Sequence, residues 1–236
     1  MSSTKHKVHR FLSSLQAYSS AMDTFNPWSD YDPIYDGTTD APQIRSSQLK
    51  AYLACRIKQA KYMLVAEAVG YQGGKFSGVP MTSERILLGN QPEIPPGIVL
   101  PNFTPKRTSC PKSAPSKTVQ EQGYAEPTAT IVWGLLQTLP LSPWEVILWN
   151  IFPFHPFKPE QGRLTNRTPR GAELDNGLEF LRQLVALCPP DVQIIAIGEK
   201  SAGTLGSACR RKVRHPANGG ANQFREQLPP LLISSS

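Results

Sequence analysis

The chain has 236 residues, of which 39% are hydrophobic, and this fits one domain with a sizeable core plus tails or insertions. No apolar run approaches the length of a membrane-spanning helix, so the sequence predicts a soluble protein without a membrane partner. The net charge of +7 is compatible with a polyanionic partner, although many proteins without such a partner carry a similar charge.

The N-terminal segment, residues 1–22, is basic and serine-rich and contains no acidic residue. That composition is typical of an organellar transit peptide. However, five apolar residues fall on one helical face: Val8, Phe11, Leu12, Leu15 and Tyr18. We favour a first helix that packs on the domain, and organellar targeting stays open as the alternative. Residues 1–40 are therefore interpreted as an N-terminal helix and connector.

A glycine-rich stretch follows the first predicted strand. A helix is expected over residues 43–60 and a buried strand over residues 62–66, and the next twelve residues include four glycines and Lys75. This order is typical of a loop that binds nucleotide phosphates, but Gly70 and Lys75 are one residue too close, and Phe76 stands where a P-loop has Ser or Thr. The remaining interpretations are a degenerate nucleotide site or a turn that needs glycine for steric reasons alone.

Residues 91–127 contain eight prolines and few large apolar groups, which predicts a long Pro-rich excursion rather than core. The segments after it alternate between amphipathic helices and apolar strands. In chain order they are a helix at 128–139 capped by Thr128, a strand at 145–150, a helix at 171–188 that begins through Thr168-Pro169, a strand at 192–198, a short helix at 200–208, a short strand at 212–216 and a helix at 222–228.

Continuous apolar strands that alternate with helices indicate a mostly parallel sheet covered on both faces. We therefore predict an α/β fold in three α/β/α layers, with a central, mostly parallel four-stranded sheet. The domain is expected to span residues 41–230, with a tail at residues 231–236.

Polar side chains follow successive strands of the predicted sheet. Glu67 follows the first strand, Asn150 ends the second, and His215 ends the fourth. In parallel sheets ligands bind at the carboxyl ends of the strands, so an acid, an amide and an imidazole are expected at one edge. Each residue also has an interpretation without a ligand: Asn150 as a turn residue, His215 as a structural histidine before proline, and Glu67 as a solvated acid.

Three segments together resemble the uracil-DNA glycosylase superfamily: "AEAVG…GGKFSG", "WNIFPFHP" and "RHPANGG". The resemblance covers about residues 40–230. It implies that Glu67 is the catalytic acid, that flipped uracil stacks on Phe76, that Asn150 binds the uracil edge and that His215 stabilises the leaving base. Gly70 stands in the uracil-binding segment, where some members have a tyrosine that blocks thymine. Two positions depart from the usual first motif: Ala66 replaces a glycine and Val69 replaces a proline.

The resemblance implies a DNA glycosylase that hydrolyses the N-glycosidic bond of uracil after base flipping, the first step of base excision repair. Its partner would be uracil-containing DNA, bound by a monomer in the cytoplasm in association with the nucleoid. The basic residues expected to contact phosphates lie near the strand ends: Lys158, Arg163, Arg167 and Arg214. The alternative left open by the altered first motif is a non-catalytic module that binds uracil-containing or single-stranded DNA.

No metal or other cofactor is expected, because the proposed chemistry requires none. The four cysteines form no C-x-x-C pair, and their spacing does not match that of the iron–sulfur branches of the superfamily. We expect them to be reduced thiols.

Overall fold

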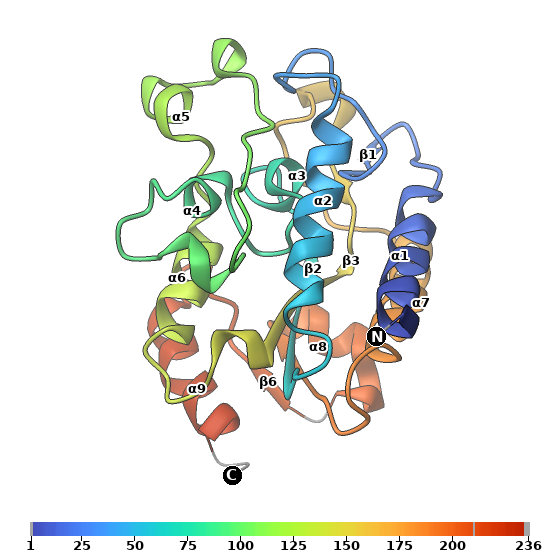
Figure 1. Ribbon diagram of the computed structural model, residues 1–236, viewed down its shortest axis with the longest axis vertical. Helices are drawn as coiled ribbons and strands as arrows, with labels where there is room; N and C mark the ends of the chain where they lie inside the picture. Colours follow the sequence, from blue (N-terminus) through green and yellow to red (C-terminus); the bar gives the residue numbers. More distant parts are fainter. Residues whose placement is uncertain (1, 210, 234–236) are drawn as a thin grey trace.

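The computed structural model describes residues 2–209 and 211–233. Its central sheet consists of β2 (Tyr62–Ala68), β3 (Val146–Phe152), β5 (Gln193–Ile197) and β6 (Arg211–Val213). The strand order is β3-β2-β5-β6, and every neighbouring pair is parallel. The prediction of a four-stranded parallel sheet in an α/β fold is confirmed (Figure 1).

Helices cover the sheet on both sides. The helices α7 (Gly171–Val185) and α8 (Glu199–Leu205) lie on one side, and α6 (Pro127–Leu136) and α9 (Ala221–Ile233) lie on the other (Figure 1). The remaining α-helices are α1 (Ser2–Gln16), α2 (Ala41–Ala54), α3 (Gly74–Ser77), α4 (Glu84–Leu87) and α5 (Lys117–Gln122). Short 3-10 turns lie at Pro96–Ile98, Pro111–Ser113, Pro143–Glu145, Pro159–Gln161 and Gly206–Ala208.

The strands β2 and β3 are longer than the sequence predicted. Their apolar side chains are buried on both faces, as is expected for a parallel sheet between helical layers. β2 continues to Ala68, so Glu67 lies within the strand, and β3 continues to Phe152, so Asn150 is paired with Ala66 rather than lying in a turn. This pairing fixes Asn150 beside the end of β2.

The N-terminal helix belongs to the main core. Val8, Phe11, Leu12 and Leu15 are buried, and the ring of Phe11 lies 5.7 Å from that of Trp149 in β3. The connector after α1 contains β1 (Thr24–Phe25), which pairs antiparallel with β4 (His155–Pro156). Residues 2–40 are therefore packed as one body with the expected domain. No helix among the described residues has both the length and the apolar character needed to cross a membrane.

The Pro-rich segment at residues 91–127 is partly core, which corrects the expectation of an excursion outside it. Its side chains at Ile94, Val99, Leu100 and Tyr124 are buried. The buried guanidinium of Arg56 donates to the carbonyl oxygens of Ile98 and Val99, both at 2.8 Å. These bonds hold the segment against α2, because a buried arginine requires hydrogen-bond partners.

Several predicted helix ends are wrong. α2 spans residues 41–54 rather than 43–60, and α6 begins at Pro127, with Glu126 rather than Thr128 at the N-cap position. α7 spans residues 171–185 rather than 171–188, and Arg170 rather than Thr168 stands at its N-cap position. The Glu173 carboxylate accepts a 2.7 Å hydrogen bond from the Arg170 backbone N–H. The predicted tail from residue 231 is also wrong, because α9 continues to Ile233 with Leu228 and Leu232 buried.

Candidate active site

A cavity of about 590 Å³ opens at the carboxyl ends of the strands. Glu67 and Gly70 from β2 and its following turn, Asn150 from β3 and His215 from the segment after β6 all line it. These residues are far apart in the sequence, and the parallel strand order brings them to one edge of the sheet. Phe76, by contrast, does not line this cavity.

Asn150 has one half of its amide fixed and the other half free. Its Nδ2 donates to the Ala68 carbonyl oxygen at 2.9 Å, which sets the orientation of the amide. Its Oδ1 is buried and has no hydrogen-bond partner among the described residues. A buried amide oxygen without a partner is costly, so this acceptor, together with the second N–H of Nδ2, is suited to a ligand in the cavity.

His215 is held in one neutral form. Its Nδ1 accepts a hydrogen bond from the Ala217 backbone N–H at 3.1 Å, so the proton of the neutral ring is on Nε2. Burial, and then the neighbouring Arg214, lower the pKa of His215 below its usual value. The backbone at Gly220 packs against the His215 carbonyl oxygen. A Cβ at position 220 would lie 2.0 Å from that oxygen, so a side chain there would clash. The cavity therefore faces a neutral imidazole that can donate a hydrogen bond from Nε2.

Glu67 is accessible from the cavity and has one cationic neighbour. Its Oε2 lies 3.7 Å from the Nζ of Lys200 on α8, and the Glu67 side chain is 25% exposed. Lys200 also donates to the Thr168 hydroxyl at 3.0 Å. A partly exposed carboxylate beside a lysine stays available to a water molecule or to positive charge that develops on a bound substrate.

The turn after β2 is held from two sides. The ring of His155 contacts the Val69 carbonyl oxygen through Nδ1 at 3.1 Å and the Arg163 carbonyl oxygen through Nε2 at 3.0 Å. The carboxyl group of Glu126 lies against Gly73, where a Cβ would meet its Oε2 at 2.2 Å. A side chain at position 73 would therefore displace Glu126, which is a steric reason for this glycine.

Phe76 is fully buried and both of its ring faces are near other groups. The Tyr124 ring stacks on it with centroids 4.5 Å apart, and the Lys75 ammonium lies 3.9 Å from its centroid. A base can stack on Phe76 only if Tyr124 moves. The expected base contact at Phe76 thus stays a prediction, and the structure describes Phe76 as part of the core.

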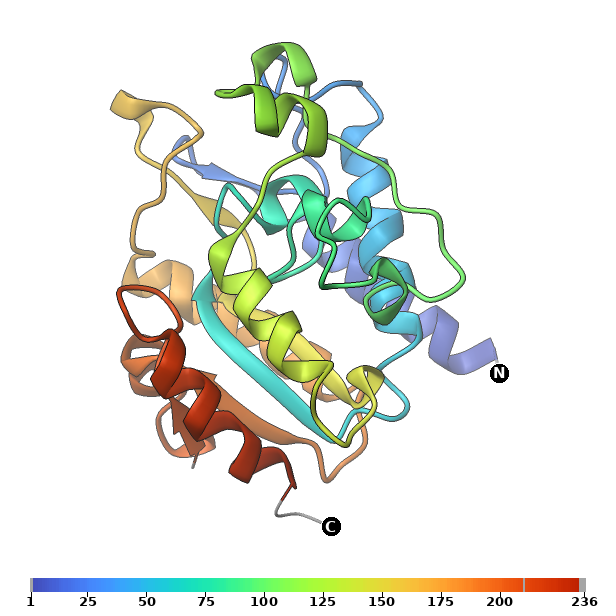
Figure 2. The ribbon, with the colours of Figure 1, turned by 90° about the vertical axis from the view of Figure 1, so that its left-hand side faces the viewer.

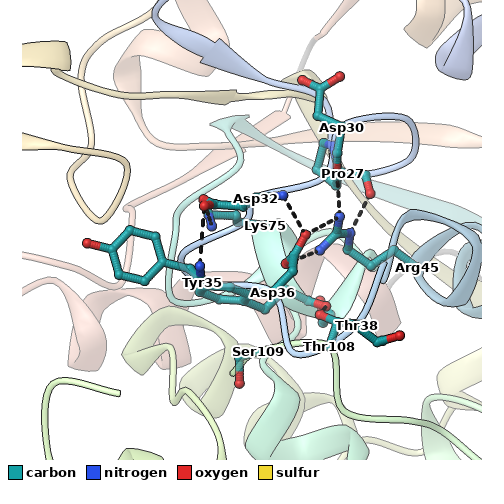
Figure 3. A network of polar contacts seen from close by, with 12 residues as sticks. Pro27, Asp30, Asp32, Tyr35, Asp36, Thr38, Arg45, Lys75, Thr108 and Ser109 are labelled. Carbon is teal, nitrogen blue, oxygen red and sulfur yellow. Dashed lines mark hydrogen bonds and ion pairs between the residues drawn. The ribbon is translucent and has the colours of Figure 1, made fainter. Parts of the chain in front are cut away.

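Lys75 faces away from the cavity into a buried polar network (Figure 3). Its ammonium lies 3.2 Å from Asp32, and Asp36 in the same network pairs with Arg45 at 2.7 Å. Burial lowers the pKa of Lys75 to about 8 against the opposing effect of Asp32 and Asp36. A lysine with a buried carboxylate partner is not placed to bind a phosphate. Lys75 therefore does not support the interpretation of the glycine-rich stretch as a degenerate P-loop.

The four expected phosphate contacts are not equivalent. Arg214 lines the cavity and is exposed. Arg167 also lines it, but its guanidinium is bound to Glu173 at 2.6 Å and to Asp23 at 3.1 Å. Lys158 and Arg163 lie outside the cavity lining, and Arg163 is 3.5 Å from Asp32. Only Arg214 among the four has a cavity position without a carboxylate partner among the described residues.

Sequence reasoning missed several polar residues of the cavity, among them Glu126, Asn166 and Lys200. Lys200 pairs with Glu67, Asn166 accepts a hydrogen bond from the Tyr71 backbone N–H at 3.1 Å, and Glu126 lies against the glycine turn. Asn166 and Glu126 are in irregular segments whose position no periodicity predicts. Lys200 had a detectable signal, because it follows the third apolar strand of the sheet at the same edge as Glu67.

Comparisons with known proteins give a structural match. No family model and no curated protein matches the chain. Among solved structures the chain is similar to SMUG2 of Pedobacter heparinus, with a TM-score of 0.64 and 14% sequence identity over 98% of this chain and 97% of that chain. At this identity the likeness establishes a common fold, which extends over nearly the whole of both chains.

Proposed function

We propose that this protein is a DNA glycosylase that releases uracil from DNA. The proposal is carried by the buried Oδ1 of Asn150, which has no hydrogen-bond partner among the described residues, in a side chain that lines the same cavity as His215, with its Nε2 donor, and Glu67. The fold shared with SMUG2, a DNA glycosylase, supports the same class of reaction.

The Asn150 amide would select the base. Oδ1 accepts from N3–H of uracil, and the N–H of Nδ2 that is not bonded to Ala68 donates to O4. Cytosine has an acceptor at N3 and a donor at the exocyclic position, so both contacts would be mismatched. Polar mismatches of this kind discriminate strongly because they leave buried groups unpaired.

The reaction breaks the bond between C1′ of deoxyribose and N1 of uracil. The bonding electrons leave with uracil, and the sugar gains oxocarbenium character. His215 donates from Nε2 to O2, where negative charge develops, and this contact strengthens in the transition state. Glu67 stabilises the sugar cation and orients a water molecule that adds to C1′, and the water proton passes to Glu67 or to solvent. The uracil anion takes up a proton from solvent, so the products are free uracil and an abasic site.

The base reaches the cavity only when it is flipped out of the helix. Arg214, at the rim, is suited to a backbone phosphate, and Lys200 can contact a phosphate if it releases Glu67. The proposal includes stacking of the flipped base on Phe76. This contact requires the Tyr124 ring to move away from the face of Phe76 that it covers.

The test is release of free uracil from an oligonucleotide that contains one labelled uracil, compared with matched oligonucleotides containing other modified bases. We expect uracil release and an abasic site that alkali cleaves. Preferential binding of the uracil oligonucleotide without release would instead support the non-catalytic DNA-binding module. Neither release nor preferential binding would overturn the assignment.

A further inference from the structure

Glu126 has an unusual environment for a carboxyl group. It is at the N-cap position of α6, lines the cavity, and its Oε2 is buried without a hydrogen-bond partner among the described residues. The carboxyl lies against two glycines of the turn after β2: a Cβ at Gly73 would be 2.2 Å from Oε2, and a Cβ at Gly70 would be 3.4 Å from Oε1. The two glycines therefore leave room for this carboxyl group.

Glu126 and His215 lie over different halves of the sheet edge. His215 follows β6, and its Cβ would be 3.1 Å from a Cβ at Gly198, which follows β5. Glu126 lies on the turn after β2, which His155 holds to the segment after β3. Because the strand order is β3-β2-β5-β6, the turn after β2, which Glu126 contacts, and the segment after β6, which carries His215, belong to strands that β5 separates. Figure 2 shows the start of α6 (yellow-green) to one side of β2 (turquoise) and the loop before α9 (red) to the other. We therefore place Glu126 and Gly70 on the side of the cavity away from His215.

The shape of a pyrimidine then decides what faces Glu126. In the uracil ring C5 is diametrically opposite C2. A base whose O2 points to His215 and whose N3–O4 edge lies on Asn150 presents C5 and the adjacent lone pair of O4 to the opposite wall. Asn150 can satisfy only the O4 lone pair on the N3 side, so the second lone pair can accept from another donor.

We propose that Glu126 is a base-contacting residue that acts in its protonated form, donating a hydrogen bond to the second lone pair of uracil O4. This inference rests on the proposed function. The proton stays on Glu126, so no bond forms or breaks there. The contact strengthens as negative charge spreads from O2 to O4 of the leaving base, which makes Glu126 the counterpart of His215 at the other carbonyl.

Burial without a partner favours the neutral form that this contact requires. It raises the pKa of Glu126 to about 7. The titratable groups that share the cavity come from four other elements or segments: Glu67, Arg167, Glu199, Lys200, Arg214 and His215. All but Arg214 and His215 have an opposite-charge partner, which for Glu67 and Lys200 is each other, and His215 is neutral above its lowered pKa.

The test compares Glu126→Gln with the wild type, because glutamine keeps the size and an N–H donor but does not titrate. The ligand is an oligonucleotide whose single uracil is attached to 2′-fluoro-deoxyribose, which resists cleavage and permits equilibrium binding. If only protonated Glu126 binds, the wild-type Kd should rise about 30-fold between about pH 6 and about pH 8.5, whereas that of Glu126→Gln should change less than about 3-fold.

Two further variants make the result specific. Glu126→Ala removes the donor, so it should weaken binding at about pH 6 and show little change in Kd between the two pH values. Glu179→Gln removes an exposed carboxylate on α7 and should retain the pH dependence of the wild type. Thermal unfolding of each variant confirms that it is folded.

Distinct outcomes separate this inference from the proposed function. Parallel pH dependence in the wild type and Glu126→Gln would overturn the role of Glu126 while leaving uracil release intact. The expected pH dependence without uracil release from the ordinary substrate would retain the contact and overturn the catalytic assignment. An equal affinity for uracil and a matched normal base, at both pH values, would overturn both.

Discussion

Two ionisable side chains with buried polar atoms adjoin the same glycine-rich turn, and they differ in their partners. Lys75, on α3, contacts Asp32 at 3.2 Å and the Phe76 ring at 3.9 Å (Figure 3). Glu126, against Gly73 and Gly70, has a buried oxygen with no partner among the described residues. Burial moves the pKa of both groups toward neutrality, to about 8 and about 7 respectively. A shifted pKa by itself therefore does not distinguish them.

The partners do distinguish them. The Lys75 network satisfies its charges inside the protein, so it stabilises the fold and offers nothing to a ligand. The cavity residues Glu126 and Asn150 each have a buried polar atom that no described residue pairs with, and a ligand can supply the missing contact. We expect substitutions in the first region to change stability and substitutions in the second to change binding and rate.

The largest effect is expected for Asn150→Asp. An ionised aspartate presents only acceptors, so it repels O4 of uracil instead of donating to it. Uracil release should fall on the order of 10⁴-fold in single-turnover experiments, because a buried polar mismatch is involved. The same experiment with a cytosine oligonucleotide tests whether the new acceptor admits an exocyclic amino group. Full uracil activity in the variant would return Asn150 to a purely structural role.

Glu67→Gln keeps the size of the side chain and removes its charge. The rate of uracil release should fall on the order of 10³-fold, since stabilisation of the sugar cation and orientation of water act mainly in the transition state. Affinity for the non-cleavable uracil oligonucleotide should be nearly unchanged. A loss confined to affinity would contradict the catalytic role of Glu67.

Asp32→Asn tests the other side of the comparison. It leaves Lys75 buried beside a neutral amide, and breaking a buried pair should lower the free energy of unfolding by about 3 kcal/mol. Urea unfolding measures this loss, and uracil release below the unfolding temperature should stay close to that of the wild type.

Two controls accompany Asp32→Asn. Glu121→Gln breaks the exposed Lys117–Glu121 pair and should have no measurable effect on stability. Combining Asp32→Asn with Lys75→Met removes the stranded charge and should recover part of the loss. A strong loss of uracil release in folded Asp32→Asn would show that the two regions are coupled, and the comparison would fail.

The smallest effect is expected for Arg214→Gln. Arg214 is exposed at the cavity, so its loss should weaken DNA binding several-fold and reduce the slope of log affinity against log salt by about 1. Arg167→Gln should act differently, because Arg167 is bound to Glu173 and Asp23. It should lower stability and leave the salt slope unchanged. Equal salt slopes for Arg214→Gln and the wild type would remove Arg214 from the DNA contact.

The sequence by itself determined the sheet and the gathering of three candidate residues. The strands β2, β3 and β5 are apolar runs that only a sheet covered on both faces can bury, and parallel strands bring their carboxyl ends to one edge. Glu67 near the end of β2, Asn150 near the end of β3 and His215 after β6 therefore line one cavity, as their positions at the strand ends predict. Their chemical roles remain proposals.

Only the tertiary structure decided which charged and aromatic side chains face that cavity. The sequence places Phe76 and Lys75 in the same glycine-rich stretch as Gly70, yet both are buried in contacts with Tyr124 and Asp32. Arg167 is a basic residue near a strand end, but Glu173 and Asp23 occupy its guanidinium. Most of these contacts join residues that are distant along the chain, so the periodicity of a helix or strand does not predict them.

Glu126 gives the physical reason most directly. In the sequence it is an acid before Pro127 in a Pro-rich segment, with nothing to distinguish it from a solvated surface residue. Packing of α6 against the turn after β2 brings its carboxyl onto Gly73, about fifty residues away in the chain, and removes water from Oε2. Local patterns fix the strands, whereas desolvation of a particular atom depends on every element packed around it.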